Sequence, residues 1–224
     1  MKFTKAASLI LSLAMAMSMA GCAESSTAQN DTASAADVQP ISESAQWQFP
    51  DDPKDYTVDD YRHMVSVNGI TITLPTTINE LKKLDEKFGY EVDYVYDGVN
   101  QVLPDGGTGY DIFITYDGKK VCLTSFSSEP DEKFIPDSEI FFAFFSNNYT
   151  DEAVDFKLFN EIKFGSEISD VKKKMSVPAT SLREMTERYK YTFESYNVNV
   201  MLGYIEQKEL CSAIISIREN CENE

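Results

Sequence analysis

Patterns of residues that support histidine-based acid–base or nucleophilic catalysis are few in this chain. There is one histidine, His63, within the run Asp60-Tyr61-Arg62-His63-Met64. Any Ser-His-Asp triad would have to use it, and a single histidine cannot form an HExxH metal motif. The sequence also contains no G-x-S-x-G elbow, P-loop or G-x-G-x-x-G run. We therefore expect His63 to lie on the surface, and we predict no catalytic residue.

Four aspartates fall close together in one stretch of the chain: Asp93, Asp97, Asp105 and Asp111. Carboxylate oxygens are good Ca²⁺ ligands, so a weak calcium site is one alternative for these residues. Their spacing matches no known calcium-binding loop, which favours solvated acids in turns. The glycine-rich run 105–109 is followed by no helix start, so we expect a hairpin loop rather than a phosphate site. We predict no metal and no cofactor.

The net charge of the chain argues against one class of partner, nucleic acid. The 224 residues include 20 Lys and Arg against 37 Asp and Glu, for a formal net charge of −17. Nucleic-acid binding needs a basic surface, so we predict no nucleic-acid partner. Hydrophobic residues make up 42% of the chain, which is enough to build a core for one domain or two small ones.

The N-terminus has the pattern of a secretory signal. Lys2 and Lys5 precede an apolar run over 6–20, and small residues follow it. The ending Met19-Ala20-Gly21-Cys22 resembles a bacterial lipobox, with Met where Leu is usual. The resemblance implies cleavage after residue 21 and lipidation of Cys22. The alternative is an uncleaved signal anchor, because the uncharged stretch approaches the length of a spanning helix.

The cysteine count leaves an odd number after lipidation. Four cysteines minus Cys22 leave Cys122, Cys211 and Cys221, which cannot all pair within one chain. Cys211 is predicted on the same strand face as Ala213, so a buried free thiol is the default. The alternatives are a disulfide that joins Cys211 to Cys221 or one that joins Cys211 to Cys122. No C-x-x-C pair indicates redox catalysis.

A polar tether follows the lipidation site. Residues 22–55 are predicted to comprise the lipidated cysteine and a disordered acidic segment, since Ser, Thr, Ala and Asp dominate its first part. Trp47, the one tryptophan, either docks on the folded domain or stays a solvated linker residue.

Two units of similar order make up the rest, 56–135 and 136–224. Each is predicted as a strand, a helix and three strands in an α+β fold. In the first unit, Asn68-Gly69 and Asp117-Gly118 are turn signals, and Thr77-x-x-Glu80 is a capping box. Between the units, 139–145 is predicted as a buried strand.

The two units align at an offset of 90 residues around their helices. Ile78 then matches Ile168, and Leu81 matches Val171, which favours an internal repeat. The run from Ile162 to Val171, followed by Pro178, resembles the helix start of BamE-like lipoproteins, whose unit occurs in tandem in β-lactamase-inhibitor-type proteins. Together with the lipobox, the chain resembles lipoproteins of Gram-positive gut bacteria. The resemblance implies antiparallel sheets with helices on one side, and non-catalytic protein binding.

These observations predict a membrane-anchored, extracytoplasmic lipoprotein that binds a protein or cell-envelope component. The alternatives are an envelope hydrolase with carboxylates in a cleft between the units, or a purely structural envelope protein. The predicted binding surface is the outward face of the second unit's sheet, which combines polar residues with two apolar ones. Its members are Lys190, Thr192, Glu194, Asn199, Met201, Ser212 and Ile214.

Lipidation at Cys22 has a direct test. Cys22 is the one nucleophile at the end of the apolar run, and stable anchoring takes two or more acyl chains. Metabolic labelling with palmitate is therefore expected to mark the wild-type chain and to be lost in Cys22→Ser, whereas Cys211→Ser, the matched control, keeps the label. Equal labelling of wild type and Cys22→Ser would contradict the lipobox interpretation.

Overall fold

The computed structural model describes residues 46–98, 106–129, 131–183, 185–206 and 208–220. The predicted signal at 1–21, the lipidation site Cys22, the tether up to residue 45, Asp105 and Cys221 lie outside these residues. Ser44–Asn220 forms one compact unit. Its helical elements are η1 (Pro53–Asp55), α2 (Val58–Arg62), α3 (Ile78–Leu84) and α4 (Ile168–Lys173).

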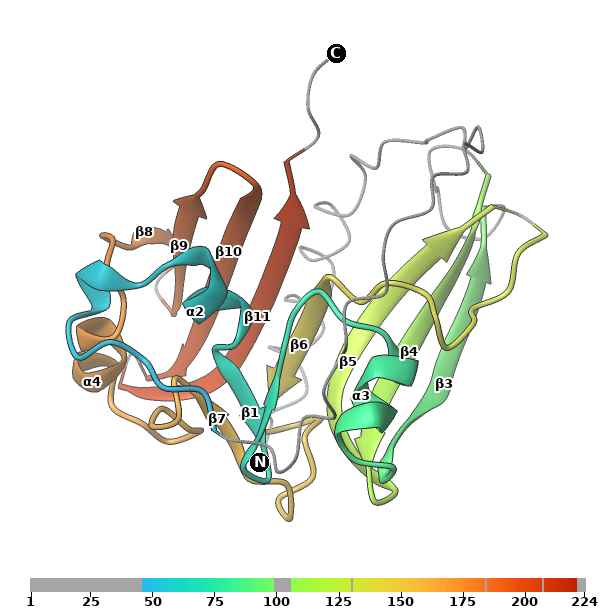
Figure 1. Ribbon diagram of the computed structural model, residues 1–224, viewed down its shortest axis with the longest axis horizontal. Helices are drawn as coiled ribbons and strands as arrows, with labels where there is room; N and C mark the ends of the chain where they lie inside the picture. Colours follow the sequence, from blue (N-terminus) through green and yellow to red (C-terminus); the bar gives the residue numbers. More distant parts are fainter. Residues whose placement is uncertain (1–45, 99–105, 130, 184, 207, 221–224) are drawn as a thin grey trace, which may run out of the picture. The chain divides into compact units, whose positions relative to one another are not determined.

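The strands are far more extensive than the helices. They are β1 (Val65–Val67), β2 (Ile70–Ile72), β3 (Phe88–Asp97), β4 (Thr108–Tyr116), β5 (Lys119–Ser128), β6 (Phe142–Ser146), β7 (Phe156–Leu158), β8 (Thr180–Arg183), β9 (Thr186–Thr192), β10 (Tyr196–Ile205) and β11 (Glu209–Glu219). A three-stranded sheet has the order β2-β1-β7, and an eight-stranded sheet has the order β3-β4-β5-β6-β11-β10-β9-β8 (Figure 1). Every strand pair is antiparallel.

The predicted turn residues close two of the hairpins. Asn68 and Gly69, between β1 and β2, have φ of 50° and 80°. Asp117 and Gly118, between β4 and β5, have φ of 50° and 70°. Positive φ at both central residues is what two-residue hairpins with the right-handed strand twist require, and Asn-Gly or Asp-Gly supplies it at least cost. These two hairpin predictions are confirmed.

The predicted α+β fold of two helix-on-sheet units is wrong. The protein is mostly β, and strands from both predicted units belong to the same large sheet, joined through β6. β1, from the first unit, also pairs with β7, from the second. The first strand expected in the second unit, before its helix, is reduced to one isolated bridge, Leu158 to Ile162. The physical reason is that helices of seven and six residues cover too little apolar surface to complete a core for each half separately.

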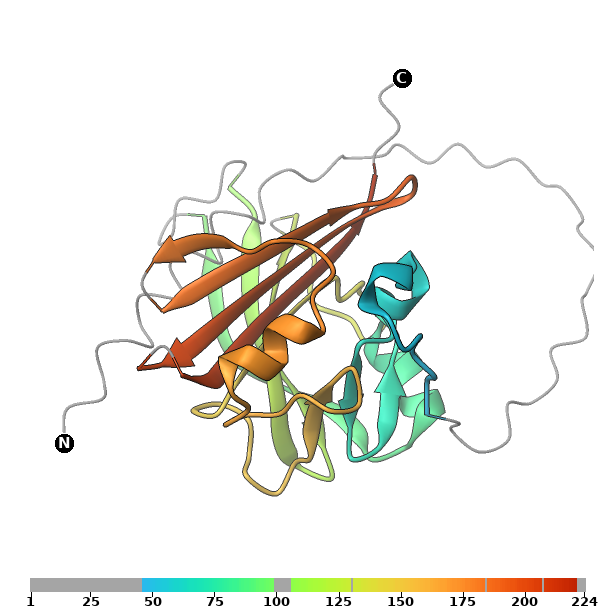
Figure 2. The ribbon, with the colours of Figure 1, turned by 90° about the vertical axis from the view of Figure 1, so that its left-hand side faces the viewer.

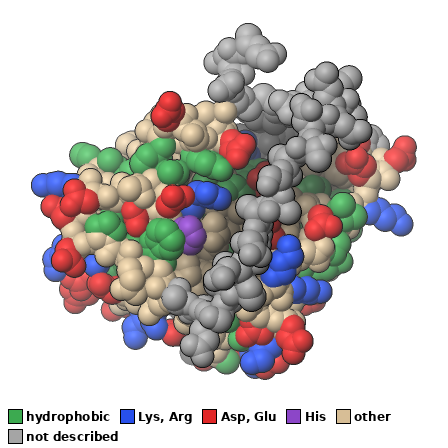
Figure 3. All heavy atoms as spheres, viewed as in Figure 1, with side chains coloured by type: hydrophobic (Ala, Val, Ile, Leu, Met, Phe, Trp, Pro, Cys, Tyr) green, Lys and Arg blue, Asp and Glu red, His purple; other side chains and the backbone are tan. Residues whose placement is uncertain are grey.

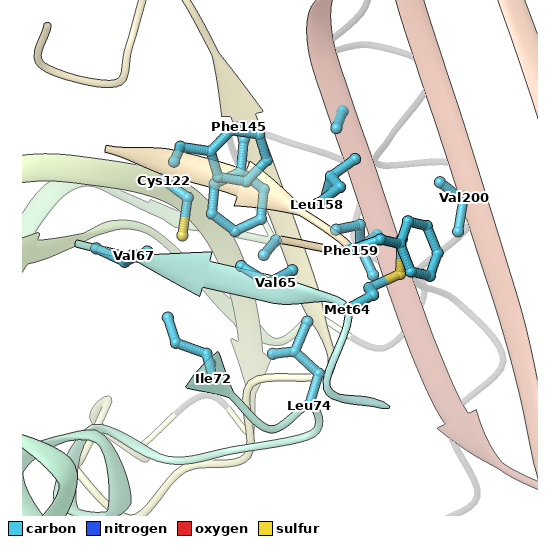
Figure 4. Close-up of a cluster of buried hydrophobic side chains, with 14 of the residues drawn as sticks. Met64, Val65, Val67, Ile72, Leu74, Cys122, Phe145, Leu158, Phe159 and Val200 are labelled. Atoms are coloured by element: carbon cyan, nitrogen blue, oxygen red, sulfur yellow. The ribbon is translucent and has the colours of Figure 1, made fainter. Parts of the chain in front are cut away.

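One core fills the space between the large sheet, the small sheet and the helices. Figure 4 shows Val65 and Val67 of β1 near Phe145 of β6 and Leu158 of β7, with Val200 of β10 at the far side. The helices bury Tyr61, Leu81 and Val171 in the same core, each fully shielded from solvent. Figure 2 shows α4 beside β9, β10 and β11. All three α-helices therefore pack on the core face of the large sheet.

Trp47 docks on the folded domain, which resolves the two alternatives for this residue. Its indole Nε1 donates to Asp60 Oδ1 at 2.9 Å, and its backbone N–H donates to Thr71 Oγ1 at 3.2 Å. The indole also stacks on the imidazole of His63, with centroids 3.8 Å apart. Asp60 closes a capping box with Thr57 at the start of α2. The sole histidine is thus a packing partner of the segment that leads into the domain.

Helix α3 offers a matched pair of leucines for a stability test. Leu81 is fully buried, whereas Leu84 on the same helix is 46% exposed. Leu81→Ala is expected to lower the free energy of unfolding by about 2–5 kcal/mol, because it removes buried methyl groups and leaves a cavity. Leu84→Ala is expected to change it by less than about 1 kcal/mol. Equal losses in denaturant unfolding would contradict this placement of α3.

Candidate binding surface

The register brings most of the predicted binding residues to one face. Lys190 pairs with Asn199, and Met201 pairs with Ile214. Ser212 and Thr192 belong to the same face by strand alternation. Glu194 lies apart, in the bend after β9 ends. The structure therefore groups six of the seven residues, on the face opposite the core.

The prediction that this face is open is wrong at its apolar centre. Met201 and Ile214 are only 4% and 5% exposed. The large sheet continues beyond β11, so Phe144 of β6 is the cross-strand neighbour of Ile214. On the other side, Arg188 of β9 pairs with Met201 and donates from Nη2 to its Sδ at 3.6 Å. Substituting Asp at either position would bury a charge, so such variants cannot probe binding without unfolding the protein.

These two residues belong to an apolar row that crosses five strands. The register aligns Phe113, Leu123, Phe144, Ile214 and Met201 in a line from β4 to β10. Tyr149 packs on the rings of Phe113 and Phe144, and the Lys120 ammonium lies 3.8 Å from the Phe113 centroid. All five residues of the row are buried but lie outside the main core cluster. The row therefore forms a second apolar layer.

Exposed apolar surface concentrates instead on β3. Among the described residues, four of the eight exposed large hydrophobic side chains lie on this strand, and they are 38–51% exposed. They are Tyr90, Val92, Tyr94 and Val95. β3 is the terminal strand of the large sheet, so one of its edges has no strand partner in the described part of the chain. We call these four residues, with Glu91 and Asp93 between them, the β3 surface.

A bulge distributes the β3 surface over both faces of the sheet. The register shifts at Asp93, between Val92 and Tyr94. Tyr90 pairs with Ile114 on the core face, whereas Tyr94 pairs with Asp111 on the opposite face. The bulge thus gives both faces of this edge an aromatic side chain.

Aromatic contacts hold the β3 surface in place from both sides. Tyr90 makes an edge contact with Phe134, with centroids 5.0 Å apart, and Tyr94 stacks on Tyr96 at 5.8 Å. The Tyr96 ring in turn lies over Gly109 of β4, where a Cβ would come within 1.9 Å of the ring. Gly109 is therefore required for Tyr96 to lie flat on the neighbouring strand. The Tyr96 ring therefore packs β3 against β4.

The β3 surface carries negative charge. Glu91 and Asp93 are exposed, and Asp111 on the adjacent strand is 7% exposed. Burial raises the pKa of the Asp111 carboxyl, the hydrogen bond donated by Ser125 at 2.7 Å opposes that rise, and the charge of Asp93 adds to it. At the right of Figure 3, where Figure 1 places β3, hydrophobic side chains lie among charged ones.

The residues considered for catalysis or metal binding are occupied otherwise or dispersed. His63 lies against Trp47, and one ring nitrogen is 2.7 Å from the Asp59 carbonyl oxygen. In the described ranges, no group of three or more His, Cys, Asp or Glu side chains is placed to hold a metal ion. That search covers Asp93, Asp97 and Asp111 of the possible calcium site, whose fourth member, Asp105, lies outside the described residues.

The cysteines that the structure describes are free thiols. Cys122 is buried and Cys211 is partly buried, so the bridge considered between them is not formed. Burial raises the pKa of both thiols. Since the thiolate is the reactive form, neither is suited to nucleophilic chemistry.

Sequence reasoning did not single out β3 as a binding surface. Tyr90, Val92, Tyr94 and Tyr96 alternate with other residues in a pattern that is typical of a strand. This alternation does not give the order of the strands in the sheet, and only that order places β3 at the end of the sheet.

Comparison with known proteins gives no relative. No protein-family model matches the chain, and neither the curated proteins nor the solved structures contain a match. Within the described residues, no helix has the length and apolar character needed to cross a membrane.

The raised pKa of Asp111 predicts a pH-dependent effect of its removal. A buried carboxyl whose pKa is higher in the folded state stays protonated there after the unfolded chain has ionised, so stability falls as pH rises through that window. Asp111→Asn keeps an oxygen that accepts from Ser125 but carries no charge. Its melting temperature is expected to exceed that of wild type at pH 7, and the gain should vanish near pH 3.

Exposed Glu152→Gln is the control for this comparison and should show little difference at either pH. A gain for Asp111→Asn that is the same at pH 3 and pH 7 would mean that ionisation of Asp111 does not affect stability.

Proposed function

We propose that the chain is a lipid-anchored, extracytoplasmic protein that binds a protein of the cell envelope without catalysis, through the β3 surface. The observation that carries this proposal is the gathering of exposed apolar side chains on one edge strand. Exposed hydrophobic residues scattered singly are ordinary, but several gathered on one strand, with charged residues between them, are typical of interaction sites. Tyrosine is also among the residues enriched in protein interfaces.

Anchoring at Cys22 fits this activity. A tether of polar residues would carry the domain away from the membrane while keeping it at the cell surface. The docking of Trp47 marks where such a tether joins the domain. Two aspartates that the structure buries have structural partners: Asp60 accepts from Trp47 and Thr57, and Asp111 accepts from Ser125. These contacts support binding over hydrolysis.

Site-specific photo-crosslinking in intact cells tests the proposal. A photoreactive amino acid replaces Val95 on β3 or, as the control, Ile205 at the end of β10, which are 51% and 47% exposed. The Val95 position is expected to give a discrete heavier species after illumination, and the Ile205 position is not. The same crosslinking pattern from both positions would contradict binding through the β3 surface.

A further inference from the structure

We infer that the β3 surface holds its partner as an added strand, by main-chain pairing with an extended, lysine- or arginine-rich segment of another protein. This inference rests on the proposed function and specifies how the partner is recognised. Peptides bind exposed sheet edges in this way, with backbone hydrogen bonds supplying affinity and alternate side chains supplying specificity.

The backbone of β3 is suited to pairing on its outer edge. The strand is ten residues long and extended on either side of the bulge at Asp93, and its sequence, FGYEVDYVYD, contains neither proline nor lysine. Natural edge strands commonly use those residues to prevent pairing. In an antiparallel pair, alternate residues direct N–H and C=O away from the partner strand. Among the described residues, none from Gly89 to Tyr96 makes a backbone hydrogen bond to a loop or cap that would occupy this edge.

The side chains of the β3 surface can contact an added strand on both of its faces. Tyr90 and Val92 pair with core-face residues of β4, Val95 returns to that face, and Tyr94 lies on the opposite face. Cross-strand aromatic and β-branched pairs each add roughly 0.2–1 kcal/mol to strand pairing. An incoming strand with apolar side chains at alternate positions therefore finds apolar neighbours on either face.

Charge selects between the possible occupants of this edge. Glu91 and Asp93 are exposed on the strand, and the charge of Asp93 is already felt by the Asp111 carboxyl. A second copy of the chain would bring a second set of the same carboxylates to this edge, in a protein with a net charge of −17. Like charges placed across strands are destabilising, and opposite charges are stabilising. The edge therefore favours a basic segment over self-association.

The test uses the purified full chain in detergent and peptides of about ten residues, the length of β3. The parent peptide alternates lysine with valine, and a matched peptide alternates glutamate with valine. Two further versions of the parent carry N-methyl groups, one at every second backbone nitrogen and one at every nitrogen. Methylation at every second nitrogen leaves one edge able to pair, whereas full methylation removes both.

Saturable binding of the parent peptide is expected, with the half-methylated version within about threefold and the fully methylated version at least about tenfold weaker. The glutamate peptide is expected to bind at least about tenfold more weakly. Parent and fully methylated peptides that bind alike, or a parent peptide that does not bind, would overturn strand pairing. Equal binding of the glutamate peptide, or a dimer of the chain detected by sedimentation, would overturn the choice of a basic partner.

Protein variants locate the effect on β3. The double variant Glu91→Gln with Asp93→Asn is expected to weaken parent-peptide binding several-fold, whereas Glu152→Gln, an exposed carboxylate elsewhere, leaves it unchanged. Equal binding by both variants would contradict recognition at β3. A crosslink specific to Val95 in cells, together with equal binding of parent and fully methylated peptides, overturns strand pairing and leaves the proposed function standing. Absence of that crosslink contradicts the proposed function itself.

Discussion

Pairing on both sides of β6 is the constraint on which the arrangement of this protein depends. β6 joins β5 through Leu123 and Phe144, and it pairs with β11 over five residues. Strands from the two halves of the chain thereby become one sheet, with Phe145 of β6 turned into the main core and Phe144 into the apolar row behind it. Because both side chains are buried, a shift of β6 by one residue would exchange two layers at once.

The large sheet ends in β3 on one side and β8 on the other, and these terminal strands each have an edge without a strand partner in the described residues. The helices and the small sheet pack on the core face, leaving β3 with exposed apolar side chains at one end. Its bulge and its carboxylates are features that limit indiscriminate edge pairing. The same features, together with aromatic side chains on both faces, give the edge the character of a selective docking strand.

Local structure was largely predictable from the sequence, and strand order was not. The Asn68-Gly69 and Asp117-Gly118 turns, the Thr77 cap of α3 and most strands follow from short-range patterns. Assembly through β6 depends on contacts between distant residues, so similar local order suggested two separate units. Cys211 shows the limit within one strand: a bulge between Gly203 and Tyr204 pairs Leu210 with Tyr204 and sends Leu210, in place of Cys211, into the core.

Hydrogen exchange of individual backbone amides tests most directly whether β3 is an accessible edge. In the free protein, the amides between Gly89 and Tyr96 that point away from β4 are expected to exchange fast and those that pair with β4 slowly, with the alternation shifted by one residue at the Asp93 bulge. Amides of β10, which pairs with β9 on one edge and β11 on the other, are expected to be protected on both edges. Alternating fast and slow exchange along β3 is the result that the account predicts. Uniform protection from Gly89 to Tyr96, equal to that of β10, would show that the edge is already covered and would contradict it.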